Sequence, residues 1–269
     1  MVHGWMDVAA SFQFVIDALE QDHWVIAPDW RGFGLTQTPN TDNFWFPDYL
    51  ADLDQLLDHY VGEQPIHLLG HSMGGHVATM YAGIRPGRIS KLINLEGFGM
   101  PATRPAQAPG RLAKWMDELK SLHRGEMDLK PYSDLEAVAQ RLMKTNPRLS
   151  SDKAHWLAEH WAHANNQGEW RILGHAAHKV VNAQLFKTDE TQAIYERITA
   201  RTLCVVASTD SLSQWWKDNY KISEFMQRIA VVPNLEHAVI SDAGHMLHHD
   251  QPEILAKLIE DFLSRQTVI

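Results

Sequence analysis

Apolar and polar positions alternate along the chain with two different periods. Short apolar runs, several of them rich in β-branched residues, predict strands at 23–28, 66–69, 89–95, 201–207 and 235–241. Between these runs, apolar residues recur three and four positions apart, which predicts helices at 9–22, 48–60, 73–85, 218–227 and 252–263. Strands that alternate with helices are typical of a parallel sheet covered by helices on both faces. We therefore expect an α/β fold built on a doubly wound, mostly parallel sheet.

This alternation stops between residues 100 and 199. Three prolines make Pro101–Gly110 a linker, and the helical patterns that follow cover 111–122, 133–144 and 152–165. No strand-like run is found here before Thr199. The pattern predicts a helical cap, residues 100–199, inserted between a first core segment, 1–99, and a second core segment, 200–269.

The most informative stretch is Gly70-His71-Ser72-Met73-Gly74-Gly75, which follows a predicted buried strand and opens a predicted helix. A serine between two glycines at such a turn is typical of a nucleophile elbow, in which strained backbone angles push the serine hydroxyl out above the sheet. The backbone N–H of Met73, at the start of the helix, would point to where an oxyanion forms. A glycine-rich turn with a surface serine is the plainer interpretation of the same five-residue pattern.

Together with His3-Gly4-Trp5, this turn resembles the α/β-hydrolase fold family, and most of all its capped, esterase-like serine hydrolases. In that family a His-Gly-x motif closes the third strand, and the resemblance implies that the N–H of Trp5 is the second oxyanion donor. Residues 242–253 resemble the loop that carries the family's catalytic histidine, which implies that His245 is the base.

The catalytic acid has two candidates. Asp210 follows the predicted strand at 201–207, where the resemblance places the acid, and the order Ser72, Asp210, His245 is that of the family. Glu96, at the end of the preceding core strand, is the second candidate, because some members carry the acid there. We expect Asp210 to be the acid.

The resemblance implies a serine hydrolase that cleaves a carboxylic ester of a small, largely apolar substrate through an acyl-enzyme on Ser72, without a cofactor. We expect the substrate to contact Met6, Phe98, Trp115, Trp156, Trp161 and Met246. The tryptophans could equally pack the cap onto the core. Hydrolysis of lactones or of carbon–carbon bonds, a protein that binds its ligand without turnover, and an inactive shortened product remain alternatives.

Composition limits the other function classes. The chain has 269 residues, 33 of them acidic and 24 basic, and its net charge of −9 comes without any cluster of lysine or arginine, so we expect no nucleic-acid partner. The only cysteine, Cys204, lies in an apolar run and cannot form an internal disulfide. No apolar run is long enough to span a membrane, and we expect a cytoplasmic protein; whether it forms a homo-oligomer is left open.

Two further expectations concern metals and the beginning of the chain. His160 and His163 could share a helix face, but no zinc-type spacing accompanies them, so we expect no metal site. Members of the family normally carry two strands and most of a third before their His-Gly motif, whereas here only Met1 and Val2 precede it. We therefore expect that the N-terminal strands are missing and that a form extended upstream would be more active and less prone to self-association.

Overall fold

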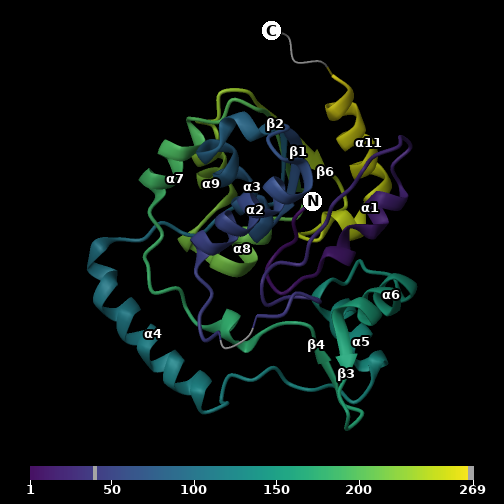
Figure 1. Ribbon diagram of the computed structural model, residues 1–269, viewed down its shortest axis with the longest axis vertical. Helices are drawn as coiled ribbons and strands as arrows, with labels where there is room; N and C mark the ends of the chain where they lie inside the picture. Colours follow the sequence, from purple (N-terminus) through teal and green to yellow (C-terminus); the bar gives the residue numbers. More distant parts are fainter. Residues whose placement is uncertain (39–40, 266–269) are drawn as a thin grey trace.

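The computed structural model describes residues 1–38 and 41–265 and has a four-stranded parallel sheet at its centre (Figure 1). The strands are β1 (Ile66–His71), β2 (Ile89–Leu95), β5 (Arg201–Ala207) and β6 (Leu235–Ile240), in the order β1-β2-β5-β6. Every adjacent pair is parallel. The predicted α/β fold with a mostly parallel sheet is confirmed.

Helices cover the sheet on both faces, because the strand side chains alternate between two apolar clusters. Leu68, Leu92 and Cys204 face a cluster that includes residues of α2 (Phe46–Val61), α3 (Met73–Ile84) and α9 (Ile222–Ile229). Their neighbours Leu69, Ile93 and Leu203 face a second cluster with α1 (Gln13–Asp17) and α11 (Pro252–Ser264). The remaining core helices are α7 (Thr188–Tyr195), α8 (Ser211–Trp216) and α10 (Leu247–Asp250), and short 3₁₀ turns lie at Ala9–Phe12, Pro86–Arg88, Pro105–Gln107, Ala176–Lys179 and Lys217–Asn219.

The first thirty residues differ from the prediction. The segment 23–28 forms no strand, and the predicted helix at 9–22 is shortened to a 3₁₀ turn followed by α1. The composition of 23–28 suits a strand, but a strand also needs a neighbouring backbone to pair with. The N-terminal ammonium group of Met1 donates to the Ile26 carbonyl at 2.7 Å. Val2 extends the sheet beside β1 by one parallel bridge to Gly70.

The inserted region has α4 (Ala108–His123), α5 (Leu135–Thr145) and α6 (Ser151–Trp161), followed by an antiparallel hairpin of β3 (Ala162–Ala164) and β4 (Trp170–Ile172). α5, α6 and the hairpin share an apolar cluster, whereas α4 has no buried residue and runs along another side of the molecule (Figure 1). The expectation of a region without strands, with a helix to residue 165, was wrong. The chain turns at Asn165–Gly168, where Gly168 has a φ of +80°, and this turn pairs β3 with β4.

Asp134 caps α5, since its side chain accepts a hydrogen bond from the Ala137 N–H. Within the described residues no helix is long and apolar enough to cross a membrane.

Candidate active site

Ser72 sits at the turn between β1 and α3 with a φ of +53° and a ψ of −119°, angles that an L-residue rarely adopts. Its N–H donates to the Leu95 carbonyl at 2.8 Å, which fixes the turn against β2. The flanking glycines are needed for space. A Cβ on Gly70 would overlap the Gly74 carbonyl, and a Cβ on Gly74 would overlap the Val2 carbonyl. The sequence therefore forms the strained turn that was predicted for Ser72.

The segment His3-Gly4-Trp5 passes directly beside Ser72. A Cβ added to Gly4 would lie 3.0 Å from the Ser72 Cβ and 3.5 Å from its Oγ. His3 is buried and held on both sides by Trp30, whose backbone N–H donates to His3 Nε2 and whose indole N–H donates to the His3 carbonyl, both at 2.9 Å. Met73 is the first residue of α3, where backbone N–H groups have no acceptor within the helix. The structure thus brings both predicted oxyanion segments to Ser72.

His245 follows β6 and contacts Glu96. Its Nδ1 lies 3.1 Å from Glu96 Oε2, while Glu96 Oε1 accepts a hydrogen bond of 2.7 Å from the Ala207 N–H. Glu96 is 1% exposed and itself has a positive φ of 53°, so its carboxyl group has a fixed orientation. Of the two acid candidates, the geometry therefore favours Glu96.

Asp210 caps the start of helix α8. Its carboxylate accepts hydrogen bonds from the Ser213 N–H at 3.0 Å and the Ser213 hydroxyl at 2.6 Å, as the N-cap of α8. We expected Asp210 to be the partner of His245, whereas in the structure its carboxylate binds Ser213 and Glu96 lies beside His245. The physical reason is local, because Ser211–Trp216 forms a helix directly after β5, and an aspartate at its start is held by the free N–H groups of the first turn.

Burial sets the charge state of the pair. It lowers the pKa of His245 to about 3 and raises the pKa of Glu96 to about 8, in both cases because a charged group loses its hydration in the interior. An imidazole that stays neutral at neutral pH is competent to accept a proton from a serine.

Two aromatic rings flank His245. Phe98 lies 6.3 Å away in a stacked orientation, and Trp215 meets the imidazole edge-on at 4.3 Å between ring centroids. Phe98 was predicted as a substrate contact, but Trp215 was missed. Trp215 is 50% exposed, so one side of its ring is available at the surface beside the imidazole. Its position in Ser211–Trp216, directly after the expected acid Asp210, gave no sign of its orientation.

The other predicted substrate residues lie in several environments. Met6 and Met246 are half-buried, and Met246 directly follows His245. Trp115 on α4 has a buried indole nitrogen. Trp156 stacks on His160 at 4.1 Å, and Trp161 donates to Asp7 Oδ1 at 3.0 Å, both within the cluster of α5 and α6. Contact between these residues and a substrate stays a prediction.

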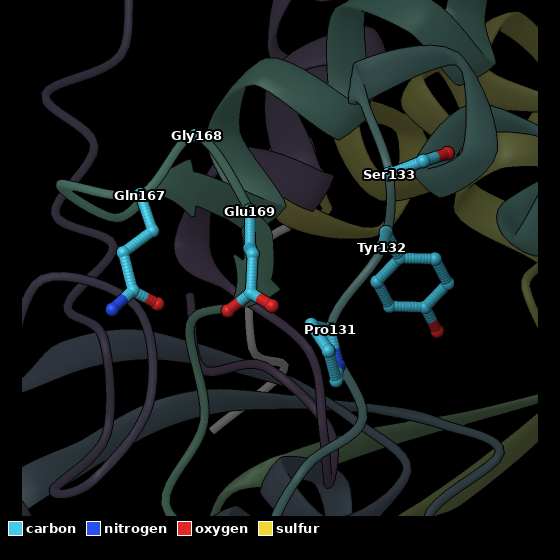
Figure 2. Close-up of a pocket in the computed structure, with 6 residues that line it drawn as sticks. All are labelled: Pro131, Tyr132, Ser133, Gln167, Gly168 and Glu169. Atoms are coloured by element: carbon cyan, nitrogen blue, oxygen red, sulfur yellow. The ribbon is translucent and has the colours of Figure 1, made fainter.

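A surface pocket of about 300 Å³ lies away from these residues, at the turn of the β3–β4 hairpin (Figure 2). Pro131, Tyr132 and Ser133 form one side, and Gln167, Gly168 and Glu169 form the other. It contains none of the predicted site residues and no serine–histidine pair, so it is not the candidate active site.

The histidine pair that we considered as a metal site does not form one. His160 lies on α6 and His163 on β3, so they do not share a helix face. Among the described residues, one group has suitable geometry: the ligand atoms of Asp7, His71 and His248 all lie within 4.8 Å of one another.

The chain is similar to known proteins over most of its length. The profile of a family described as alpha/beta hydrolase fold matches residues 1–252. A serine hydrolase-like protein of Danio rerio is 23% identical over 99% of this chain and 81% of its own length. A cis-3-alkyl-4-alkyloxetan-2-one decarboxylase of Shewanella oneidensis is 32% identical over 43% of this chain and 36% of its own length.

Solved structures show the same fold. The thioesterase domain from the curacin biosynthetic pathway has a TM-score of 0.81 and 25% identity, and the match covers 96% of this chain and 89% of that domain. A hypothetical protein of Pseudomonas aeruginosa has a TM-score of 0.85 and 22% identity, with 98% of this chain and 90% of the other covered.

Proposed function

Because this chain belongs to the α/β-hydrolase fold family, we propose that it is a serine hydrolase that cleaves carboxylic esters of small, largely apolar substrates. The observation that carries the proposal is the backbone of Ser72, which has a φ of +53° between β1 and α3. Such strain persists only where surrounding structure holds it, and it exposes a nucleophile above the carboxyl edge of a parallel sheet. The segments of His3-Gly4-Trp5 and Met73 adjoin the same serine.

In the proposed mechanism, His245 Nε2 removes the hydroxyl proton of Ser72 as its Oγ attacks the ester carbonyl. The backbone N–H groups of Trp5 and Met73 stabilise the resulting oxyanion. The tetrahedral intermediate then collapses, and the leaving alcohol takes the proton back from His245. Water, activated by the same imidazole, attacks the acyl-enzyme and releases the carboxylic acid and the free serine.

We assign the role of the acid to Glu96, with Asp210 as the alternative. In its ionised form, the Glu96 side chain accepts the Nδ1–H of His245, keeps Nε2 free of a proton and stabilises the imidazolium that forms in the transition state; since burial raises the pKa of Glu96 to about 8, this form predominates only above that pH. The 3.1 Å separation between Glu96 Oε2 and His245 Nδ1 supports this role, whereas the Asp210 carboxylate is occupied by Ser213.

Aromatic and thioether side chains around His245 support an apolar acyl or alkyl group in the substrate. Phe98 and Trp215 flank the imidazole, and Met246 follows it. The names of the similar proteins, a serine hydrolase-like protein and a thioesterase domain, are consistent with acyl transfer to a serine.

Labelling with a fluorophosphonate probe, followed by hydrolysis of p-nitrophenyl esters of increasing chain length, tests the proposal. We expect the wild type to be labelled and to hydrolyse esters, and Ser72→Ala to lose both activities while its circular dichroism and Tm stay close to wild type. Ser133→Ala is the matched control, because Ser133 is an exposed serine on the surface of the inserted region. A wild type that is neither labelled nor active, or labelling that persists in Ser72→Ala, would contradict the proposal.

Lactone hydrolysis is a second candidate, because the Shewanella oneidensis relative is named for a reaction on an oxetan-2-one, a four-membered lactone. The same serine, base and oxyanion donors would open a lactone and give a hydroxy acid. Adding β-lactones to the ester panel separates the two substrate classes, since the proposal for esters requires a higher kcat/KM for open-chain esters.

A further inference from the structure

Behind the turn that carries Ser72 lies a buried polar cluster formed by Asp7, His71 and His248. Asp7 follows the segment of Trp5, His71 is the last residue of β1, and His248 lies on α10. Their exposed fractions are 3%, 1% and 0%. The proposed ester hydrolysis uses none of these side chains directly, so their presence in the interior needs another explanation.

Each of the three residues has a buried atom without a hydrogen-bond partner in the described part of the chain: Asp7 Oδ2, His71 Nδ1, and both ring nitrogens of His248. Buried polar atoms of this kind are rare, since they lose their bonds to water and gain nothing in return. These atoms are also too far apart to pair directly, because Asp7 Oδ2 and His248 Nε2 are separated by 4.0 Å. Their arrangement leaves space for a shared small partner.

The protonation state of His71 can be derived from its other nitrogen. His71 Nε2 lies 2.8 Å from the carbonyl oxygen of His245, which can only accept a hydrogen bond, so Nε2 carries the proton. With the proton on Nε2, the neutral imidazole has a free lone pair on Nδ1, the atom without a hydrogen-bond partner. A histidine that ligates a metal usually donates its second N–H to a carbonyl or carboxylate in this way.

Asp7 is oriented by similar contacts. Its Oδ1 accepts hydrogen bonds from the Val8 N–H at 2.9 Å, the Trp161 indole N–H at 3.0 Å and the Ser11 hydroxyl. These three donors come from two distant parts of the chain and fix the plane of the carboxylate. The second oxygen, Oδ2, is thereby left free toward the histidines, as for a carboxylate ligand held by outer hydrogen bonds.

We propose that Asp7, His71 and His248 bind one divalent transition-metal ion, with zinc as the best match. Two imidazole nitrogens and one carboxylate oxygen are a common zinc ligand set, with a water in the fourth position. Ligand atoms about 2.0–2.1 Å from one zinc ion are roughly 3.3 Å apart in a tetrahedron. The observed atoms all lie within 4.8 Å of one another, so side-chain rotations that shorten each separation by at most about 1.5 Å complete the site.

This site is distinct from Ser72 and its proposed reaction. The ion would join the segment after Trp5, the end of β1 and helix α10, and through His71 it would hold the carbonyl of His245. Because its detection requires no turnover, the inference does not depend on the proposed esterase activity. The competing occupant is a single water, which could also bridge the three side chains.

The experiment uses the full-length protein treated with EDTA and then desalted. Zinc is added in molar excess either to the folded protein or during refolding from guanidinium chloride, since the site is buried. After a second desalting step, bound zinc is measured by inductively coupled plasma mass spectrometry, and the Tm is compared with that of the metal-free protein. Co²⁺ loading provides an optical readout of the coordination geometry.

We expect one zinc ion per chain, a higher Tm, and the intense visible absorption of four-coordinate Co²⁺. Asp7→Asn and His248→Gln should each lose bound metal and the Tm increase. His155→Gln is the control, because His155 and Glu136 form an exposed histidine–carboxylate pair where a surface ion would bind. This control should retain the metal.

Absence of bound zinc after both loading routes would overturn the proposal and leave water as the occupant. Metal that persists in Asp7→Asn and His248→Gln, or that is lost in His155→Gln, would overturn it as well. Should both cluster variants fail to fold, X-ray absorption of zinc-loaded wild type decides. A first coordination shell with two imidazoles supports the site, and one with fewer overturns it.

Discussion

The Oε2 atom of Glu96 lies 3.1 Å from the Nδ1 atom of His245, although one residue ends β2 and the other follows β6. The strand between them, β5, brings them together. Glu96 N–H donates to the Val205 carbonyl at 3.0 Å, and Ala207 N–H donates back to the Glu96 side chain. The carboxyl group therefore reaches across the end of β5 toward the loop after β6.

The first prediction separates the two acid candidates. Glu96→Gln should lower kcat by about 10²- to 10⁴-fold, because an amide no longer favours the histidine tautomer in which Nε2 is free. Asp210→Asn should change kcat little and preserve the fold, since asparagine caps a helix about as well as aspartate. Steady-state kinetics of both variants provide the measurement, and a larger loss in Asp210→Asn would return the role to Asp210.

The second prediction concerns the pH dependence of kcat/KM. Neutral imidazole is the active form of the base, and burial lowers the pKa of His245 to about 3, so the base stays neutral as the pH falls. We expect the limb that reports protonation of His245 to lie below pH 6.5, the ordinary value for histidine, and a separate rise in kcat/KM near pH 8 as Glu96 ionises, because burial raises its pKa to about 8. A single limb between about pH 6.5 and 7.5 would mean that attraction between the imidazolium and an ionised Glu96 outweighs the desolvation of both groups.

Acid stability provides a third prediction. Burial lowers the pKa of His3 and His76 to about 4 and that of His249 to about 3. In the unfolded chain these groups bind protons near pH 6.5, so the free energy of unfolding should fall as the pH decreases from about 6.5 toward 4. Each histidine contributes a slope of up to about 1.4 kcal/mol per pH unit in this window.

The raised pKa values of Asp7, to about 6, and of Glu96, to about 8, oppose this trend, but these two acids are outnumbered by the buried histidines. Urea unfolding at a series of pH values measures the net slope. His76→Gln should reduce it, whereas His155→Gln, at an exposed position, should not. A free energy of unfolding that is independent of pH between 4 and 6.5, within roughly the error of extrapolation, would contradict the expectation.

The fourth prediction tests Trp215, whose ring meets His245 edge-on at 4.3 Å. Trp215→Ala should raise KM for esters with large apolar groups by roughly tenfold, the effect expected from loss of one aromatic contact of 1–1.5 kcal/mol. KM for acetate esters should change little. Because Trp215 is half-exposed, the Tm should stay near that of the wild type. Equal losses for short and long esters would indicate displacement of His245 instead.

Sequence patterns predicted the buried strands best. The bounds of β2 and β5 match the predicted runs because these strands are covered on both faces and most of their residues are apolar. The segment 23–28 has a similar composition but no strand, since pairing depends on residues elsewhere in the chain. The hairpin of β3 and β4 has only three residues on each side, too few for a periodic signal.

In the candidate site, too, local motifs could be predicted from the sequence, whereas contacts between distant segments could not. Ser72 and His3-Gly4-Trp5 were predicted as site residues because their motifs impose the local turn, and the structure places the two segments side by side. The partner of His245 could not be chosen from the chain order, because Glu96 and Asp210 both follow core strands. Their roles separate only through tertiary hydrogen bonds, with Glu96 held by Ala207 and Asp210 held by its own helix turn.

Gly74 lies so close to the Val2 carbonyl that not even a methyl group would fit between them. Substitutions at Gly74 and in residues 1–5 are therefore coupled by this contact, although the two segments are distant in sequence. A substitution at Gly74 without a compensating change in residues 1–5 would displace the Val2 carbonyl, and with it the backbone that leads to Trp5. Directed evolution of this chain would then gain most from libraries that vary the two segments jointly, because single-site steps at this contact begin with a steric penalty.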